Sequence, residues 1–111
     1  MENITSYKIE IFIPETHVET LLDALAEVGV GVIGNYDHCA SITIVRGTWR
    51  PLPGANPYNG AVGQLSQATE AKVEVNSPAE RVPDAMRVIR QIHPYEEPVI
   101  NVIPLANQLF L

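Results

Sequence analysis

The first part of the chain alternates hydrophobic and polar residues and then changes to helical spacing. From Tyr7 to Ile13 every second side chain is apolar, a pattern typical of a strand with one buried face. Pro14 ends this alternation, because proline has no backbone N–H to donate within a sheet. Over residues 15–28 the apolar side chains instead share one helical face, which predicts an amphipathic helix. They are Val18, Leu21, Leu22, Leu25 and Val28.

Both ends of this helix carry sequence signals. Thr16 and Glu19 have the spacing of a capping box, in which the two side chains accept hydrogen bonds from the first backbone N–H groups. Gly29 and Gly31 follow the last apolar position, and glycine readily adopts the left-handed backbone that ends helices. We therefore expect the helix to begin near Thr16 and to stop at Gly29.

The middle of the chain predicts a strand followed by an irregular segment. Residues 38–45 alternate apolar and polar side chains again, as a second strand would. Arg46-Gly47 is expected to form a turn into a short return segment over residues 48–52. Residues 51–63 hold three prolines and three glycines, a density that neither a helix nor a central strand tolerates.

The second half of the chain repeats the order of the first. Residues 71–75 predict a third strand, and Ser77-Pro78-Ala79-Glu80 has the composition of a helix start. The helix predicted over residues 78–92 is followed by a last strand over residues 99–103. Its apolar face consists of Val82, Ala85, Met86, Ile89 and Ile92.

The chain thus reads twice as strand, proline, helix and strand. Two such units joined by a hairpin give the order β-α-β-β-α-β, the ferredoxin-like plan of the α+β class, with both helices on one face of an antiparallel sheet. We expect a single domain over residues 1–111 with its core between residues 7 and 105. The other sheet face and the sheet edges would be exposed, and a homo-oligomer would cover them.

Composition narrows the function. The chain has 111 residues, 46% of them hydrophobic, and a net charge of −6, which argues against nucleic acid because phosphate binding needs clustered Lys and Arg. No apolar run approaches the roughly 20 residues of a membrane span, so no membrane partner is expected. The single cysteine excludes an internal disulfide and fits a cytoplasmic protein.

Two short clusters hold most of the residues capable of chemistry. His93-Pro94-Tyr95-Glu96-Glu97-Pro98 places an imidazole, a phenol and two carboxylates in the turn before the last strand. Gly34-Asn35-Tyr36-Asp37-His38-Cys39 follows the first helix. Imidazole, thiolate and carboxylate groups suit zinc or copper, so a divalent metal is the candidate cofactor. The alternative, which we favour, is that the histidines are structural or lie at a subunit interface.

The expected topology decides which of these residues lie together. The two helix-to-strand connections of a ferredoxin-like sheet lie at opposite ends, which separates His38 from His93 within one subunit. His17, at the start of the first helix, shares an end with His93, so the candidate metal ligands are His17, His93 and Glu96. Cys39 lacks the arrangement of a catalytic triad, and a small buried cysteine is the commoner case.

The glycine- and proline-rich segment over residues 51–63 has two interpretations. It contains no lysine and leads into a strand, so a nucleotide-binding loop is disfavoured. Asn56, Tyr58 and Trp49 instead provide hydrogen-bonding groups and aromatic area for contact with a ligand or partner. The alternative is an ordered loop that packs on itself or on a neighbouring subunit.

Four motifs follow one another along the chain. They are Pro14-Glu15, Gly34-Asn35-Tyr36-x-His38-Cys39, Gly54-Ala55-Asn56-Pro57-Tyr58-x-Gly60-x-Val62-Gly63 and His93-Pro94-Tyr95-Glu96-Glu97. In this order they resemble one known domain, the insert domain of the NGG-interacting-factor (Nif-three, or YqfO-like) family, formerly described as a type-two GTP cyclohydrolase. The resemblance covers roughly residues 7–105.

The resemblance implies a PII-like and CutA-like fold and a freestanding copy of the insert. The dinuclear metal centre of the full-length family members lies in segments that flank the insert, so hydrolase-like activity is not expected. It implies a non-enzymatic domain that forms a homo-oligomer, most simply a trimer, and binds a small ligand, a metal ion or a partner protein. Alternatives are a CutA-like protein of divalent-metal tolerance and, more distantly, an enzyme with its site between subunits. The candidate ligand-binding residues are Tyr36, His38, Asn56, Tyr58 and Tyr95.

Overall fold

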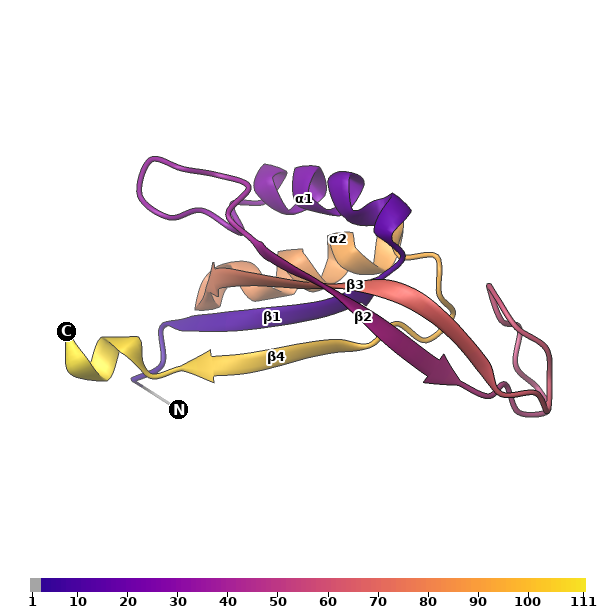
Figure 1. Cartoon of the computed structure of the whole chain (residues 1–111). Helices are drawn as coiled ribbons and strands as arrows, with labels where there is room; N and C mark the ends of the chain where they lie inside the picture. The colour runs from indigo at the N-terminus through magenta and orange to yellow at the C-terminus, as the bar shows by residue number, and fades with distance from the viewer. Residues whose placement is uncertain (1–2) are drawn as a thin grey trace.

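Four antiparallel strands form one sheet in the order β2-β3-β1-β4, with two helices on one of its faces (Figure 1). The computed structural model describes residues 3–111. The predicted ferredoxin-like α+β fold is confirmed. Its main elements are β1 (Ser6–Ile13), α1 (Val18–Glu27), β2 (Ser41–Trp49), β3 (Ser66–Pro78), α2 (Val82–Ile92) and β4 (Ile100–Leu105), with short 3₁₀ helices η1 (Glu15–His17), η2 (Ala79–Arg81) and η3 (Asn107–Phe110).

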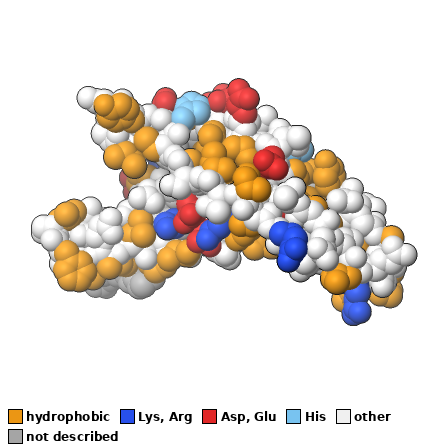
Figure 2. Space-filling model, viewed as in Figure 1, with side chains coloured by type: hydrophobic (Ala, Val, Ile, Leu, Met, Phe, Trp, Pro, Cys, Tyr) orange, Lys and Arg blue, Asp and Glu red, His pale blue; other side chains and the backbone are white. Residues whose placement is uncertain are grey.

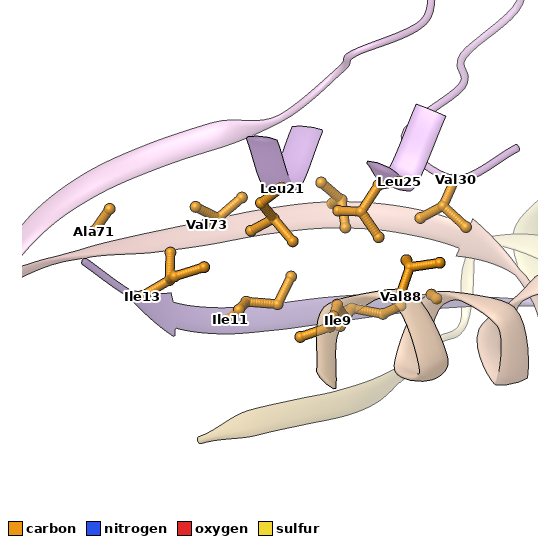
Figure 3. Close-up of a cluster of buried hydrophobic side chains, with 12 residues drawn as sticks. Ile9, Ile11, Ile13, Leu21, Leu25, Val30, Ala71, Val73 and Val88 are labelled. Carbon is orange, nitrogen blue, oxygen red and sulfur yellow. The ribbon is translucent and has the colours of Figure 1, made fainter. Parts of the chain in front are cut away.

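The hydrophobic core lies between the sheet and the two helices. The isoleucines of β1 pair with small or branched residues of β3, as Ile9 does with Val75 and Ile11 with Val73. Figure 3 shows these side chains on the side of the sheet that faces Leu21 and Leu25 of α1. Each fully buried aliphatic side chain stabilises the fold by about 1.5–3 kcal/mol. The alternation in β1 therefore fixes which sheet face receives the helices.

The opposite sheet face is polar and charged in its middle. Lys8 of β1 forms an ion pair with Glu74 of β3 at 2.9 Å, and Lys72 of β3 approaches Glu10 of β1 at 3.5 Å. These four side chains alternate in charge across the two central strands. This face consequently has no dry apolar layer in its middle.

Both helices begin with a proline and a 3₁₀ turn, and neither uses the predicted capping box. Pro14 and Pro78 are the residues that precede the turns, with ψ values of 141° and 149°, and no side-chain cap hydrogen bond forms at either start. Ser77 lies in the buried part of β3, where its hydroxyl donates a hydrogen bond to the Pro78 carbonyl at 2.9 Å. The predictions that Thr16–Glu19 and Ser77–Glu80 form capping boxes are therefore wrong. The fixed φ of proline supplies the sharp change of direction instead.

The predicted glycine stop of the first helix is confirmed. Gly29 has φ +78°, and its N–H donates to the Ala26 carbonyl at 3.0 Å. The next N–H, from Val30, donates to the Leu25 carbonyl at 2.9 Å. This pair of bonds is the Schellman motif, which satisfies the carbonyls left free at a helix end.

The predicted turn at Arg46-Gly47 does not exist, because β2 runs unbroken from Ser41 to Trp49. Gly47 pairs with Ala68 of β3, and a Cβ at this position would collide with the carboxylate of Glu70. The glycine thus makes room for a neighbouring side chain within the sheet rather than forming a turn. β3 is also longer than the predicted 71–75, so the hairpin loop spans only residues 50–65.

Candidate ligand-binding cleft

His93, the residue that ends α2, is held by two hydrogen bonds in a nearly buried position. Its exposed fraction is 8%, and its Nε2 lies 2.6 Å from the carbonyl oxygen of Phe12 in β1. A carbonyl can only accept, so Nε2 carries the hydrogen. Nδ1 in turn accepts from the backbone N–H of Tyr95 at 3.2 Å. Burial lowers the pKa of His93, which agrees with a neutral ring that donates at one nitrogen and accepts at the other.

Tyr95 links this turn to the loop between β2 and β3. Its ring centre lies 4.8 Å from that of His93 and 5.8 Å from that of Tyr58, both in tilted arrangements. Burial raises the pKa of Tyr95 to about 12, with further contributions from the negative charge of Glu70 and a hydrogen bond to it. The phenol is therefore protonated at physiological pH.

The loop over residues 50–65 is held against the His93–Pro98 turn and against its own strands. Glu96 Oε2 accepts a hydrogen bond from the backbone N–H of Asn56 at 3.0 Å. The indole of Trp49 donates to the Asn59 carbonyl at 2.9 Å. The loop is thus ordered by specific bonds despite its glycines and prolines.

A cleft of about 570 Å³ opens between this loop, the turn and the ends of β1 and β3. Its volume is within the range of small-molecule sites in proteins. Four aromatic side chains and three carboxylates contribute to its lining, together with one guanidinium, that of Arg50. They are Phe12, Trp49, Tyr58 and Tyr95, and Glu70, Glu96 and Glu97.

The structure divides the predicted ligand-binding residues into two groups. Asn56, Tyr58 and Tyr95 meet at the cleft, whereas Tyr36 and His38 lie in the connection from α1 to β2. This connection is at the other end of the sheet, on the left of Figure 1, while the β2–β3 loop is on the right. One site within a single chain therefore cannot contain all five residues. The prediction placed these five residues in one list because all of them belong to the family motifs, whereas the fold separates them into two regions.

His38 instead fastens its own loop to α1. Its Nε2 lies 2.9 Å from Asp23 of α1, and its Nδ1 lies 2.9 Å from Asp37. Both partners are carboxylates, so both ring nitrogens donate and the pKa of His38 is raised, most strongly by the hydrogen bond to Asp37. This contact is exposed and joins two parts of the chain remote from the cleft.

The predicted metal ligands do not form a coordination site in this structure. Within residues 3–111 no three His, Cys, Asp or Glu side chains are placed to hold a metal ion together. His17 does lie near enough to His93 to lower its pKa, as expected for residues at the same end. Both nitrogens of His93 are already hydrogen-bonded, however, and Glu96 is bonded to the loop.

Glu70 is not among the site residues predicted from the sequence, although it is the most buried charged residue of the cleft, with an exposed fraction of 8%. The predicted third strand begins one residue later, at Ala71, so Glu70 falls between this strand and the irregular segment predicted over residues 51–63. Extending the alternation of Glu74 and Lys72 backwards would have placed it on the same sheet face. Gly47 was a second signal, since its lack of a side chain accommodates the Glu70 carboxylate.

Comparison with known proteins gives a partial match to one family model and matches to several curated relatives. The family model described as CutA1 divalent ion tolerance protein matches residues 59–110. A protein named GTP cyclohydrolase 1 type 2 homolog from Halalkalibacterium halodurans is 36% identical over 102 residues, covering 92% of this chain and 27% of that protein.

Solved structures agree with both matches. A Bacillus cereus protein related to NIF3 superposes with a TM-score of 0.79 at 34% identity, covering 92% of this chain and 26% of that one. The PII-like protein CutA from Nostoc sp. PCC 7120 superposes with a TM-score of 0.68 at 19% identity, covering 95% of this chain and 86% of that one. The second likeness concerns the fold alone.

These comparisons confirm the resemblance predicted from the motifs. The chain is homologous to a segment of NIF3-related proteins, and its fold is that of CutA and PII-like proteins. It spans about a quarter of the length of the curated relatives it matches. Among the described residues, no helix has the length and apolar character needed to cross a membrane.

The lowered pKa of His93 predicts an acid-sensitive fold. The unfolded chain, with an ordinary histidine pKa of about 6.5, binds this proton more readily than the folded chain, so stability falls as pH drops below about 6.5. In His93→Gln the amide can make both hydrogen bonds without titrating. We expect urea unfolding at pH 7.5 and 5.5 to show a smaller loss of stability for the variant.

The same comparison controls for the other histidines. His38, with a raised pKa, acts in the opposite direction, but it is present in both proteins and cancels. Equal pH dependence in wild type and His93→Gln would contradict the assignment of His93 as the buried neutral histidine.

Proposed function

We propose that this chain is a non-enzymatic domain that binds a small ligand in the cleft between the β2–β3 loop and the His93–Pro98 turn. The supporting observation is the ordered, aromatic-lined cavity itself, formed by segments from four parts of the chain. The bond from Asn56 to Glu96 and the contact of Tyr58 with Tyr95 hold its two sides together. A wall ordered in advance loses little conformational entropy on binding.

The surroundings of the cysteine support a binding role over catalysis. Cys39 Sγ contacts the backbone carbonyls of Tyr36 and Asp37 at 3.6 and 3.7 Å. Its neighbour His38 is bonded to two carboxylates, so it offers no free base to the thiol. The name of the curated relatives describes proteins more than three times as long as this chain, and their activity is not assigned to it. The cytoplasmic location stays a prediction.

A second candidate is binding of a divalent metal. It is favoured by the match to the family model described as CutA1 divalent ion tolerance protein, whose range includes His93 and Glu96. A metal would have to displace one of the two hydrogen bonds of His93 or recruit ligands from another copy of the chain. Either route makes the neutral imidazole a requirement.

Self-association is the third part of the proposal. β2 and β4 are the edges of the sheet, and their backbone groups are open to pairing with another chain. Ile42 and Ile44 of β2 are 48% and 53% exposed, because neither helix extends over this edge. Figure 2 shows hydrophobic side chains exposed across this view of the molecule and at its two ends. We propose a homo-oligomer, with a trimer as the expected form.

The cleft can be tested with the chain's own fluorescence. Trp49 is the single tryptophan and lines the cavity, so its emission reports occupancy directly. In a screen of small organic fragments, we expect hits that change Trp49 emission and lose about tenfold or more in affinity in Tyr58→Ala, because one aromatic wall is removed. Tyr36→Ala, which removes an exposed tyrosine at the other end, should bind as wild type does. If the affinities of the fragments are the same in both variants as in the wild type, the fragments bind outside the cleft.

The proposal of divalent-metal binding is tested by a separate experiment. If it is correct, titration calorimetry with zinc or copper at pH 7.5 should show binding that weakens at pH 5.5, as histidine protonates. His93→Gln should abolish that binding, and His38→Gln should leave it unchanged. Equal affinity in wild type and His93→Gln, or no binding in either, would reject His93 as a metal ligand.

The proposed assembly predicts a mass in solution that is a multiple of 12.2 kDa. Ile44→Lys places a charge on the exposed apolar side of the β2 edge and should shift the protein toward the monomer in light scattering. Gln91→Lys adds the same charge on the exposed surface of α2 and serves as the control. A wild-type protein that stays monomeric at tens of micromolar, about the range where such interfaces hold, would contradict self-association.

A further inference from the structure

The charge distribution of the cleft identifies the kind of ligand it would take. Glu70 lies on the polar face of the sheet, paired across the strands with Val45, and its carboxylate occupies the space above Gly47. It lines the cleft, although only 8% of the residue is exposed. A buried carboxylate of this kind is costly unless a positive group or several hydrogen bonds compensate it.

The other carboxylates on the central strands of this face have cationic partners, and Glu70 does not. Glu74 pairs with Lys8, and Glu10 with Lys72. Within residues 3–111, no Lys, Arg or His nitrogen lies within 4.0 Å of the Glu70 carboxylate. Tyr95, whose pKa is raised in part by the nearby Glu70, is neutral and leaves the negative charge uncompensated.

The walls around Glu70 are suited to a positive charge on an apolar body. The faces of Phe12, Trp49, Tyr58 and Tyr95 offer aromatic surface, and aromatic faces attract organic cations. Glu96 and Glu97 add two carboxylates at the exposed rim. Among the residues that the structure describes, Arg50 is the one cationic residue of the lining, and it forms no ion pair with these carboxylates.

The same features disfavour two other ligand classes. A phosphorylated ligand would meet three carboxylates against the single guanidinium of Arg50, with no lysine among the described lining residues. A bare metal ion would need several converging donors, and the described residues provide no such group of three. The remaining class is an organic molecule that carries its charge on an ammonium or guanidinium group.

We propose that the cleft binds a small organic cation, with its charged group against Glu70 and its apolar part against the aromatic walls. This inference rests on the proposed ligand-binding function of the same cleft. A lysine or arginine side chain of another protein has the same chemistry, but the cleft volume of about 570 Å³ is in the range of sites for free small molecules.

The test uses three probes that share one apolar body and differ in charge: 4-phenylbutylamine, 4-phenylbutanol and 4-phenylbutyrate. Trp49 emission is followed during titration of the wild-type protein. We expect the amine to bind about tenfold or more tightly than the alcohol, and the carboxylate most weakly, because a charge-assisted contact is stronger than a neutral one. The preference should decrease in high salt.

Two matched variants test whether Glu70 is the source of the preference for the amine over the alcohol. Glu70→Gln keeps the size of the side chain and its hydrogen bond to Tyr95, and should lower the affinity for the amine about tenfold while leaving the alcohol unchanged. Glu74→Gln makes the same change on the same strand face, at a carboxylate that already has a lysine, and should have no effect. Circular dichroism checks that both variants fold.

The outcomes separate this inference from the proposed function. Equal binding of amine and alcohol to the wild type overturns the cation preference while the cleft remains a binding site. Equal losses in both variants overturn the role of Glu70. If Nα-acetyl-lysine amide binds and 4-phenylbutylamine does not, the assignment to a free small molecule is wrong. If none of the three probes binds, the inference fails, and the fragment screen alone then decides the proposed function.

Discussion

The hydrogen bond from His93 to the backbone of Phe12 is the contact on which the geometry of the cleft depends. It joins the end of α2 to the end of β1, one of the two central strands, 81 positions away along the chain. The other nitrogen of the same ring accepts from the N–H of Tyr95, so one side chain fixes both the strand end and the turn. Burial keeps the ring neutral, and only the neutral ring can make both bonds.

The other contacts that shape the cleft extend from this hydrogen bond. Tyr95 lies against His93 and reaches Tyr58, and Glu96 fastens the backbone of the β2–β3 loop at Asn56. A loop with many glycines and prolines has little intrinsic order, since it cannot form helix or strand bonds. Its order here comes from contacts with a turn that follows it by some forty residues. The shape of the cleft and the conformation of the loop therefore depend on the same set of bonds.

The cleft is also complete within the segment that the NIF3-related relatives share. Its lining residues fall between Phe12 and Val99, inside the region of similarity that covers 92% of this chain. The residues that line the cleft therefore all belong to the part of the chain that is similar to those proteins.

The sequence by itself determined the element order, the buried face of β1 and the glycine that ends α1. Those features follow from local rules, namely alternation, helical spacing and the conformations open to proline and glycine. It also placed Asn56, Tyr58 and Tyr95 among the candidate site residues. Only the tertiary structure decided that Gly47 continues a strand and that Glu70 faces the cleft. Each of these depends on which residue lies across from which in the sheet, and strand register is set by packing of the whole sheet rather than by any local pattern.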